Sequence, residues 1–427
     1  MLSRFNMNSL NTNGRSHPLI AEVGVIALMP EHWSNHWMGR HQLLTRLAGF
    51  FHVVWVNPAN EWRKILRTRK EPSMQRAITG QIPGFFVYDP EFWLPKLYRP
   101  EWLARLSFNQ QLRRGLRLLT SRGCRKIILY LWRPNFADAL HSIPFNLSCY
   151  HISDEYSFSD VDLPVGESER QLIAKVDQVF IHSPELLAKK GKINPHTVFV
   201  PNGVDYEAYS KPVAEPSDLA SIPHPRIGYT GIIKRTLDWP LLLHLTLQHP
   251  EWHFVFVGPQ NPHHPEISGP IQELSSHRNV HFLGAKSTRE LAAYPQHMDV
   301  CIMPYRQNSH STKFGYPLKL HEYLASGRPA VGSPLRTLQE FAHVIKLART
   351  GEEWSKALSD SLSPAARSAT QIEARQSVAL QHDWNKLVGL IARTMCARLG
   401  PAYLERFEKN PISEPYTEIY LPTVAIG

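Results

Sequence analysis

The chain has 427 residues, 43% of them hydrophobic and 20% charged, which is typical of a soluble globular protein with two or three domains. It contains no run of about 18 apolar residues, so we expect no transmembrane helix. Residues 1–18 lack the apolar segment of a signal peptide, and the four cysteines form no CxxC pair. These features indicate reduced thiols in a cytoplasmic protein.

The net charge of +10 is concentrated in the first third of the chain. Residues 1–126 hold 19 Lys and Arg against 7 Asp and Glu, whereas the remainder holds 28 against 30. This excess suggests an anionic partner for residues 61–126, such as a membrane surface at which the protein would be peripheral. The alternative is a solvated basic face over core aromatics. Nucleic acid is disfavoured, because no reader motif accompanies the charge.

The first half predicts a parallel α/β domain over residues 1–210. Apolar strands at 20–29 and 52–57 flank a helix at 41–48, which is a βαβ unit. Further strands are predicted at 126–132, 147–152, 177–183 and 198–200, and helices at 108–119 and 184–190. Ligands bind at the carboxyl ends of such strands, so the loop 31–40 lies on the functional edge. The alternative for this loop is a packed aromatic segment.

A Pro- and Ser-rich linker at 211–225 separates a second α/β domain, residues 226–364. Its strands are predicted at 226–231, 252–259, 280–284, 300–304 and 329–332, with helices at 237–248 and 290–297. Residues 365–427 form a tail, which is predicted to be helical at 365–396.

The stretch 314–332 predicts a loop, a short helix, a glycine stop and a buried strand. Leu320, Tyr323 and Leu324 fall on one apolar face, whereas Lys319 and Glu322 fall on a separate polar stripe. A lysine in the first helical turn is explained if it shares an anion with the free N–H groups there. A carboxylate one turn later would accept hydrogen bonds from hydroxyls beside that anion, as in a nucleotide. The alternative is an ordinary exposed Lys–Glu pair.

A glycine loop opens the second domain. Gly228 and Gly231 let the backbone approach a ligand, and Lys234 and Arg235 follow closely with positive charge. Taken alone, the loop is equally an ordinary turn. Its position about 85 residues before the Pro-x-Lys-x-x-Glu helix favours a paired phosphate site.

With these motifs the chain resembles the GT-B glycosyltransferases, specifically the retaining group 4 type of the Pro-x-Lys-x-x-Glu subtype. The matching segments cover most of the chain, and the most specific is the Pro-Leu-Lys-Leu-His-Glu-Tyr-Leu-Ala-Ser-Gly-Arg-Pro run. The others include 40–44, 93–109, 150–155, 182–187, 200–205, 228–231, 256–259, 282–284 and the Trp384 region. The resemblance implies two Rossmann-like, doubly wound domains facing across a cleft, with a C-terminal helix that crosses back to the first.

The resemblance also implies roles for individual residues. Glu322 would bind the ribose of a UDP- or GDP-linked sugar, and the turn Pro317, Leu318 and Lys319 would hold its diphosphate. The remaining donor residues would be Gly231, Lys234 and Arg235 at the phosphates and Gly284 and Lys286 near the base. Lys319, Glu322 and Asp154 would act in catalysis, and Trp33, His36 and Arg40 would face the acceptor. No metal and no cofactor is expected.

Two positions depart from that family's common form. Phe314 stands eight residues before Glu322, where a paired glutamate is usual, and His151 stands where an aspartate is usual. The resemblance nevertheless implies transfer of a sugar, with retention, to a saccharide or lipid-linked saccharide in bacterial surface or exopolysaccharide biosynthesis. The alternatives are a nucleotide-sugar 2-epimerase and a non-catalytic GT-B carbohydrate-binding subunit.

Overall fold

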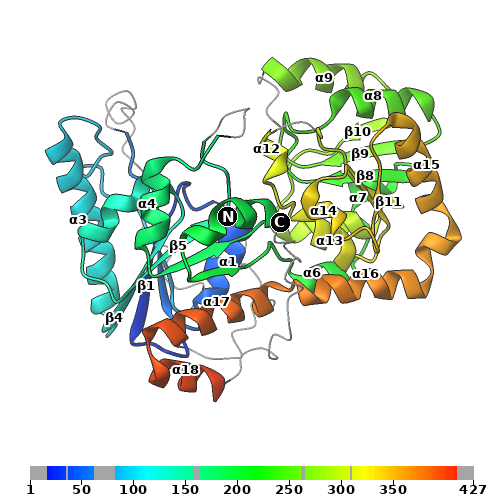
Figure 1. Cartoon of the computed structure of the whole chain (residues 1–427). Helices are drawn as coiled ribbons and strands as arrows, with labels where there is room; N and C mark the ends of the chain where they lie inside the picture. The colour runs from blue at the N-terminus through cyan, green and yellow to red at the C-terminus, as the bar shows by residue number, and fades with distance from the viewer. Residues whose placement is uncertain are drawn as a thin grey trace.

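The computed structural model describes residues 17–34, 37–61, 82–157, 163–260, 265–307 and 310–410. Two α/β domains lie side by side (Figure 1). The chain passes from the first domain to the second near Val204 and returns to the first near Asp383. His36 and the basic residues 62–81 lie outside the described residues.

The first domain is built on a seven-stranded sheet in the order β3-β2-β1-β4-β5-β6-β7, with every neighbouring pair parallel. β1 and β2 are buried along their whole length, which explains why their sequences are apolar without alternation. β3 was not predicted, because it is a four-residue edge strand. The strands are β1 Val23–Leu28, β2 His52–Val56, β3 Phe85–Tyr88, β4 Lys126–Leu131, β5 Leu147–Ile152, β6 Gln178–Ile181 and β7 Thr197–Phe199.

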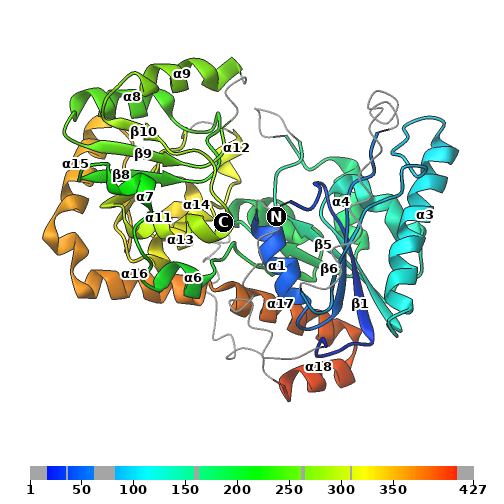
Figure 2. The same cartoon turned by 180° about the vertical axis from the view of Figure 1, so that it is seen from behind.

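Helices cover both faces of this sheet (Figures 1 and 2). α3 is longer than predicted and begins directly after Pro100. The helices are α1 Gly39–Leu47, α3 Glu101–Thr120, α4 Glu167–Lys175 and α5 Pro184–Lys190, with 3-10 turns η2 Pro134–His141 and η3 Gly191–Ile193. The next helix, α6 Tyr206–Ser210, packs instead against α13 and α16 of the second domain.

The second domain has a six-stranded parallel sheet in the order β10-β9-β8-β11-β12-β13. Its strands are β8 Arg226–Thr230, β9 His253–Val257, β10 Val280–Phe282, β11 Val300–Met303, β12 Ala330–Gly332 and β13 Lys346–Leu347. Its helices are α7 Ser217–Ala220, α8 Trp239–Gln248, α9 Pro265–Ser275, α10 Thr288–Leu291, α11 Ala293–Gln296, α12 His310–Lys313, α13 Lys319–Ala325, α14 Arg336–Gln339 and α15 Gly351–Leu362. The prediction of two Rossmann-like domains is confirmed.

The tail is helical but interrupted. It comprises the 3-10 turn η4 Pro364–Arg367 and the helices α16 Ala369–Gln381, α17 Trp384–Leu399 and α18 Pro401–Glu408. α16 packs against α13, so it extends the second domain. Asp383 caps α17, whose residues Leu387, Val388 and Ile391 enter the core of the first domain. The predicted crossing back is therefore made by α17, and it begins at residues 382–383 rather than at 365.

The two chain segments that connect the domains, around Val204 and around Asp383, lie next to each other. The N–H of Val204 donates to the carbonyl of His382 (2.9 Å), and the N–H of Trp384 donates to the carbonyl of Val204 (2.9 Å). A Cβ at Gly203 would come within 2.6 Å of the His382 carbonyl oxygen, so the two segments touch at a glycine. None of the helices among the described residues is both long and apolar enough to span a membrane.

Candidate active site

Helix α13 presents a buried face and a half-buried polar stripe, as its sequence predicts. Leu320, Tyr323 and Leu324 are fully buried, whereas Lys319 and Glu322 are half-buried. The helix begins at Lys319, two residues after Pro317, whose carbonyl accepts the N–H of Leu320 (3.2 Å). The polar stripe therefore lies directly after a turn at the carboxyl edge of the second sheet.

The ammonium of Lys319 is held by tyrosines. It donates to the hydroxyl of Tyr305 (2.9 Å) and lies 4.6 Å from the ring centroid of Tyr229. Burial acts to lower the pKa of Lys319, but the oxygens of Tyr229 and Tyr305 outweigh it and hold the pKa well above its ordinary value. The lysine is therefore protonated at neutral pH, and no ion pair with a carboxylate among the described residues neutralises it.

Glu322 has its own partner, since it hydrogen-bonds to the side chain of Tyr209 in α6. Burial raises the pKa of Glu322, while the charge of Lys319 and the bond to Tyr209 oppose that rise. Neither side chain is exposed, and each is oriented by a different aromatic residue. The arrangement thus differs from the exposed Lys–Glu pair that the sequence left open.

The glycine loop after β8 faces Lys319 directly. A Cβ at Gly231 would lie 3.3 Å from the Lys319 Nζ, and Gly231 has a φ of +117°. A Cβ at Gly258 would overlap the Gly231 carbonyl oxygen at 2.1 Å, so these two loops also require glycine where they meet. The N–H of Gly258 donates to the carbonyl of Gly284 (2.8 Å), which joins the loops after β8, β9 and β10.

The two other predicted phosphate contacts differ in surroundings. Partial burial lowers the pKa of Lys234; Lys319 lowers it further, whereas Tyr305 and Asp154 act in the opposite direction. The Lys234 side chain is nevertheless partly exposed to solvent. Arg235 is exposed and lies 3.8 Å from a carboxylate oxygen of Glu266. Lys234 is thus within the electrostatic influence of Lys319, while Arg235 lies near Glu266 of α9.

The side chain of Lys286 is tied to the segment between the domains. Its ammonium lies 2.6 Å from the Asp218 carboxylate, which also accepts the hydroxyl of Tyr294 (2.8 Å). The hydrogen bond to Asp218 raises the pKa of Lys286. The Lys286 ammonium is therefore engaged by Asp218.

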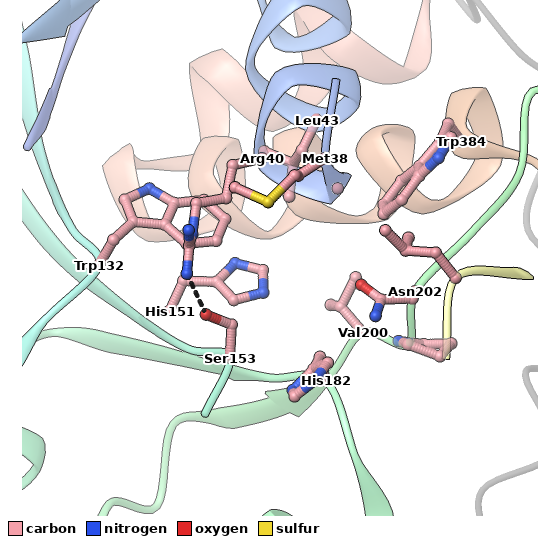
Figure 3. A pocket seen from close by; sticks show the side chains of 13 residues that line it. Met38, Arg40, Leu43, Trp132, His151, Ser153, His182, Val200, Asn202 and Trp384 are labelled. Atoms are coloured by element: carbon pink, nitrogen blue, oxygen red, sulfur yellow. Dashed lines mark hydrogen bonds between the residues drawn. The ribbon is translucent and has the colours of Figure 1, made fainter. Parts of the chain in front are cut away.

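A pocket lies on the first-domain side, at the carboxyl ends of its strands (Figure 3). The indole rings of Trp132 and Trp384 stand on its opposite sides, and Leu318 of the second domain completes it. Its lining residues are Met38, Gly39, Arg40, Leu43, Trp132, His151, Ser153, His182, Val200, Pro201, Asn202, Leu318 and Trp384.

Of the predicted acceptor-side residues, Arg40 lies at the pocket and Trp33 does not. Arg40 lines the pocket, donating to Ser153 Oγ (3.1 Å) and pairing with both carboxylate oxygens of Glu31 (2.8 and 2.7 Å). Trp33 instead packs on Trp55, with ring centroids 5.1 Å apart, in the first-domain core. For Trp33, the alternative of a packed aromatic loop is therefore the one that the structure supports.

Asp154 follows β5 and is exposed. One of its carboxylate oxygens accepts the N–H of Glu155 (2.9 Å), which fixes the loop. Its charge reaches Lys234 of the opposite domain, because it acts to raise the pKa of that lysine. Asp154 thus interacts electrostatically with Lys234.

Two histidines line the pocket, and the sequence singles out only His151, as a departure from the resembled family. His151 stacks on Trp132 (4.2 Å between centroids), and its Nδ1 lies 2.7 Å from the hydroxyl of Tyr130. Burial lowers the pKa of His151 well below its ordinary value and that of His182 to about 4. Both imidazoles are therefore neutral near pH 7. The sequence signal that could have identified both as site residues is their position at the carboxyl ends of β5 and β6.

Phe314 takes part in a contact between the domains. It is 3% exposed and belongs to the hydrophobic core cluster of the first domain, although it lies in the second. The ammonium groups of Lys189 and Lys313 lie 5.0 and 5.3 Å from its ring centroid. Nearby, Asn202 Nδ2 donates to the carbonyl of Tyr316 (2.7 Å). Phe314 and Tyr316 thus hold this part of the second domain against the first.

Comparisons with known proteins agree with this architecture. Residues 227–363 match the family model described as Glycosyl transferases group 1. The chain is 34% identical over 179 residues to TuaH of Bacillus subtilis (strain 168), a protein named as a teichuronic acid biosynthesis glycosyltransferase. That alignment covers 40% of this chain and 44% of the relative, so the chain matches less than half of that relative's length.

Several solved structures share the fold over nearly their whole length. Sucrose-phosphate synthase from Thermosynechococcus elongatus superposes with a TM-score of 0.64 at 16% identity, covering 88% of this chain and 99% of that one. HepE of Anabaena, solved with UDP and glucose, gives 0.61 at 13% identity over the same shares. A UDP-N-acetylglucosamine 2-epimerase from Listeria monocytogenes gives 0.53 at 10% identity, covering 93% and 100%. At these identities the likeness shows the fold alone, and the protein has the GT-B fold.

Proposed function

We propose that the protein is a glycosyltransferase that moves a sugar from a nucleotide-diphosphate-sugar to a saccharide or lipid-linked saccharide, with retention of anomeric configuration. The observation that carries the proposal is the approach of the Lys319 ammonium to the backbone of Gly231. An un-neutralised, protonated lysine facing a glycine loop is suited to bind a diphosphate. The family match of residues 227–363 and the named role of the Bacillus relative support the same activity.

In this proposal, the donor lies on the second domain. Lys319 and Lys234 would contact the diphosphate, and Glu322 would accept hydrogen bonds from the ribose of a UDP- or GDP-linked sugar. As the bond from the anomeric carbon to the diphosphate oxygen breaks, negative charge accumulates on that oxygen. Fixed cations stabilise the charge where it develops, because they need no reorganisation during the reaction.

The acceptor would occupy the first-domain pocket beside Arg40 and Asp154. Its hydroxyl oxygen forms the new bond to the anomeric carbon, and its proton passes to the departing diphosphate oxygen, so no protein base is required. The neutral imidazoles of His151 and His182 are suited to hydrogen-bond sugar hydroxyls without adding charge. Surface polysaccharide biosynthesis at the cytoplasmic side of a membrane is the setting that we propose.

The first test is nucleotide binding, measured as the thermal shift caused by UDP and by GDP. We expect one of them to stabilise the wild-type protein and Glu322→Ala to lose that shift. Glu273→Gln, an exposed change on α9, serves as the matched control and should keep it. If neither nucleotide shifts the wild type, the protein is the non-catalytic subunit instead.

The second test separates transfer from epimerisation. The wild-type protein is incubated with nucleotide sugars, with and without saccharide acceptors, and the products are followed by NMR. A transferase forms a glycosylated acceptor and needs that acceptor for turnover. Release of a free epimerised sugar without any acceptor would contradict the proposal and support the 2-epimerase, whose fold is also shared.

A further inference from the structure

Exposed aromatic side chains are concentrated at one edge of the first domain. Among the described residues, ten large hydrophobic side chains are exposed, and five of them come from residues 92–106. These five, with exposed fractions from 48% to 68%, are Phe92, Trp93, Tyr98, Trp102 and Leu106. Single exposed apolar residues are common on soluble proteins, but a local cluster of this size marks an interaction site.

Helix α3 orders part of this cluster. With about 100° per residue, Trp102, Leu106, Arg113 and Arg117 fall within about 60° of one another around the helix. All four are exposed, whereas the opposite face of α3 is buried against the sheet through residues such as Leu112. The outer face of α3 is therefore aromatic at its start and basic toward its end.

The segment before α3 is held in place. Gln111 Nε2 donates to the carbonyl of Leu94 (3.0 Å), and Ser107 Oγ donates to the carbonyl of Pro95 (2.8 Å). The rings of Phe92 and Trp93 pack edge to face at 4.9 Å. Buried polar groups on α3 thus fix exposed aromatics beside it. We call Phe92, Trp93, Tyr98, Trp102, Leu106, Arg113 and Arg117 the aromatic–basic surface.

The charge around the aromatic–basic surface is predominantly positive. Residues 91–126 contain nine Lys and Arg but only two carboxylates, Glu91 and Glu101. Glu91 is paired with Arg114 (3.2 Å) and accepts the hydroxyl of Tyr88 (2.6 Å). Glu61 accepts the hydroxyl of Tyr98 (3.2 Å), so the positive charge is partly compensated, but the segment that carries the exposed aromatics keeps a clear excess of Lys and Arg.

We infer that the aromatic–basic surface binds the anionic face of a lipid bilayer, with α3 lying parallel to it. Tryptophan and tyrosine favour the boundary between headgroups and acyl chains, and arginine pairs with lipid phosphates. α3 lies at the edge of the first domain remote from the second (Figures 1 and 2), so a bound membrane leaves the pocket uncovered. Binding would bring a lipid-linked acceptor to the enzyme. This role for membrane binding rests on the proposed function.

The test is cosedimentation of the full chain with sucrose-loaded vesicles of phosphatidylcholine, with and without 30% phosphatidylglycerol, at low and high salt. We expect binding to the anionic vesicles only. Arg113→Gln/Arg117→Gln should weaken it roughly thirtyfold and flatten its salt dependence. Trp93→Ser/Trp102→Ser should remove the binding that persists at high salt. Leu247→Ser/Lys356→Gln, exposed on the second domain, is the matched control and should bind as the wild type does.

Other occupants of the surface give different results. Equal binding by the wild type and both surface variants would overturn the inference, as would no binding to anionic vesicles. A wild-type dimer in sedimentation velocity that Trp102→Ser converts to monomer would instead identify a second copy as the partner. Glu322→Ala separates the two proposals, because it should bind vesicles normally even if nucleotide binding is lost or never present.

Discussion

The Lys319 ammonium lies where a side chain at Gly231 would begin, with only 3.3 Å between Nζ and the position of a Cβ. Two segments almost 90 residues apart in the chain are thereby matched to each other at the carboxyl edge of one sheet. The lysine is supported from the other side by Tyr229 and Tyr305. Substitutions at either residue should therefore affect the same binding step.

Gly231→Ala should lower both stability and nucleotide affinity. Its φ of +117° strains any L side chain by about 1–3 kcal/mol, and the new methyl group would displace the lysine. Urea denaturation and UDP titration would measure the two effects. Gly123→Ala is the control, because its φ of +85° imposes similar strain with no atom near its Cβ. It should lose stability and keep its affinity; a loss of affinity there too would show that strain alone explains the result.

Lys319→Met should remove charge from the site while keeping the apolar contact with the tyrosine rings. We expect the affinity for UDP to fall by roughly tenfold to a hundredfold, as when a charged hydrogen bond is lost. Uridine, which has no diphosphate, should bind the variant and the wild type equally. Calorimetric titration of both ligands distinguishes a phosphate contact from a general disturbance, which would weaken both.

Acid should destabilise the protein below pH 6.5 through its buried histidines. Burial lowers the folded-state pKa of His41 and of His382 from 6.5 to about 4. Between these values the unfolded chain binds protons that the folded chain does not, so the free energy of unfolding falls as the pH drops from 6.5 toward 4. Each histidine contributes on the order of 1–3 kcal/mol to this loss.

The variant His382→Gln should reduce that dependence. Denaturation midpoints at pH 7.5 and pH 5 would be compared for the variant and the wild type. A smaller difference between the two pH values is expected for the variant, whatever its stability at pH 7.5. An unchanged difference would mean that His382 is not protonated on unfolding in this range.

Phe314→Glu should not improve activity, although it introduces the carboxylate usual in the resembled family. The ring is buried in the core cluster of the other domain, so a charge there would cost about 3 kcal/mol or more of stability. Phe314→Leu, which keeps an apolar side chain, should be much milder. Greater turnover by the glutamate variant at equal stability would contradict the packing role.

The sequence predicted the parts of this protein that depend on local periodicity. The continuous apolar runs of β1 and β2 predict buried parallel strands, and the spacing of Leu320 and Tyr323 predicts the buried face of α13. Each of these features is determined within a few residues. The GT-B fold followed from the order of such elements together with the resemblance.

Features that depend on distant partners could not be predicted in this way. Lys286 pairs with Asp218, which lies 68 residues earlier, and Phe314 packs on the opposite domain. The loop 31–40 has the composition of a binding loop, yet its residue Trp33 packs in the core beside Trp55. The sequence predicts a tail that is helical at 365–396 without a break, but the structure has a break at Asp383, because α16 and α17 pack against different domains.

The return of α17 to the first domain has a consequence for biosynthesis. Its buried residues Leu387, Val388 and Ile391 complete a core whose other members are encoded mainly before residue 200. The ribosome must therefore make nearly the whole chain before the first domain can close. Until then, the apolar surface that receives α17 is exposed, and the nascent protein is open to aggregation or chaperone binding during synthesis.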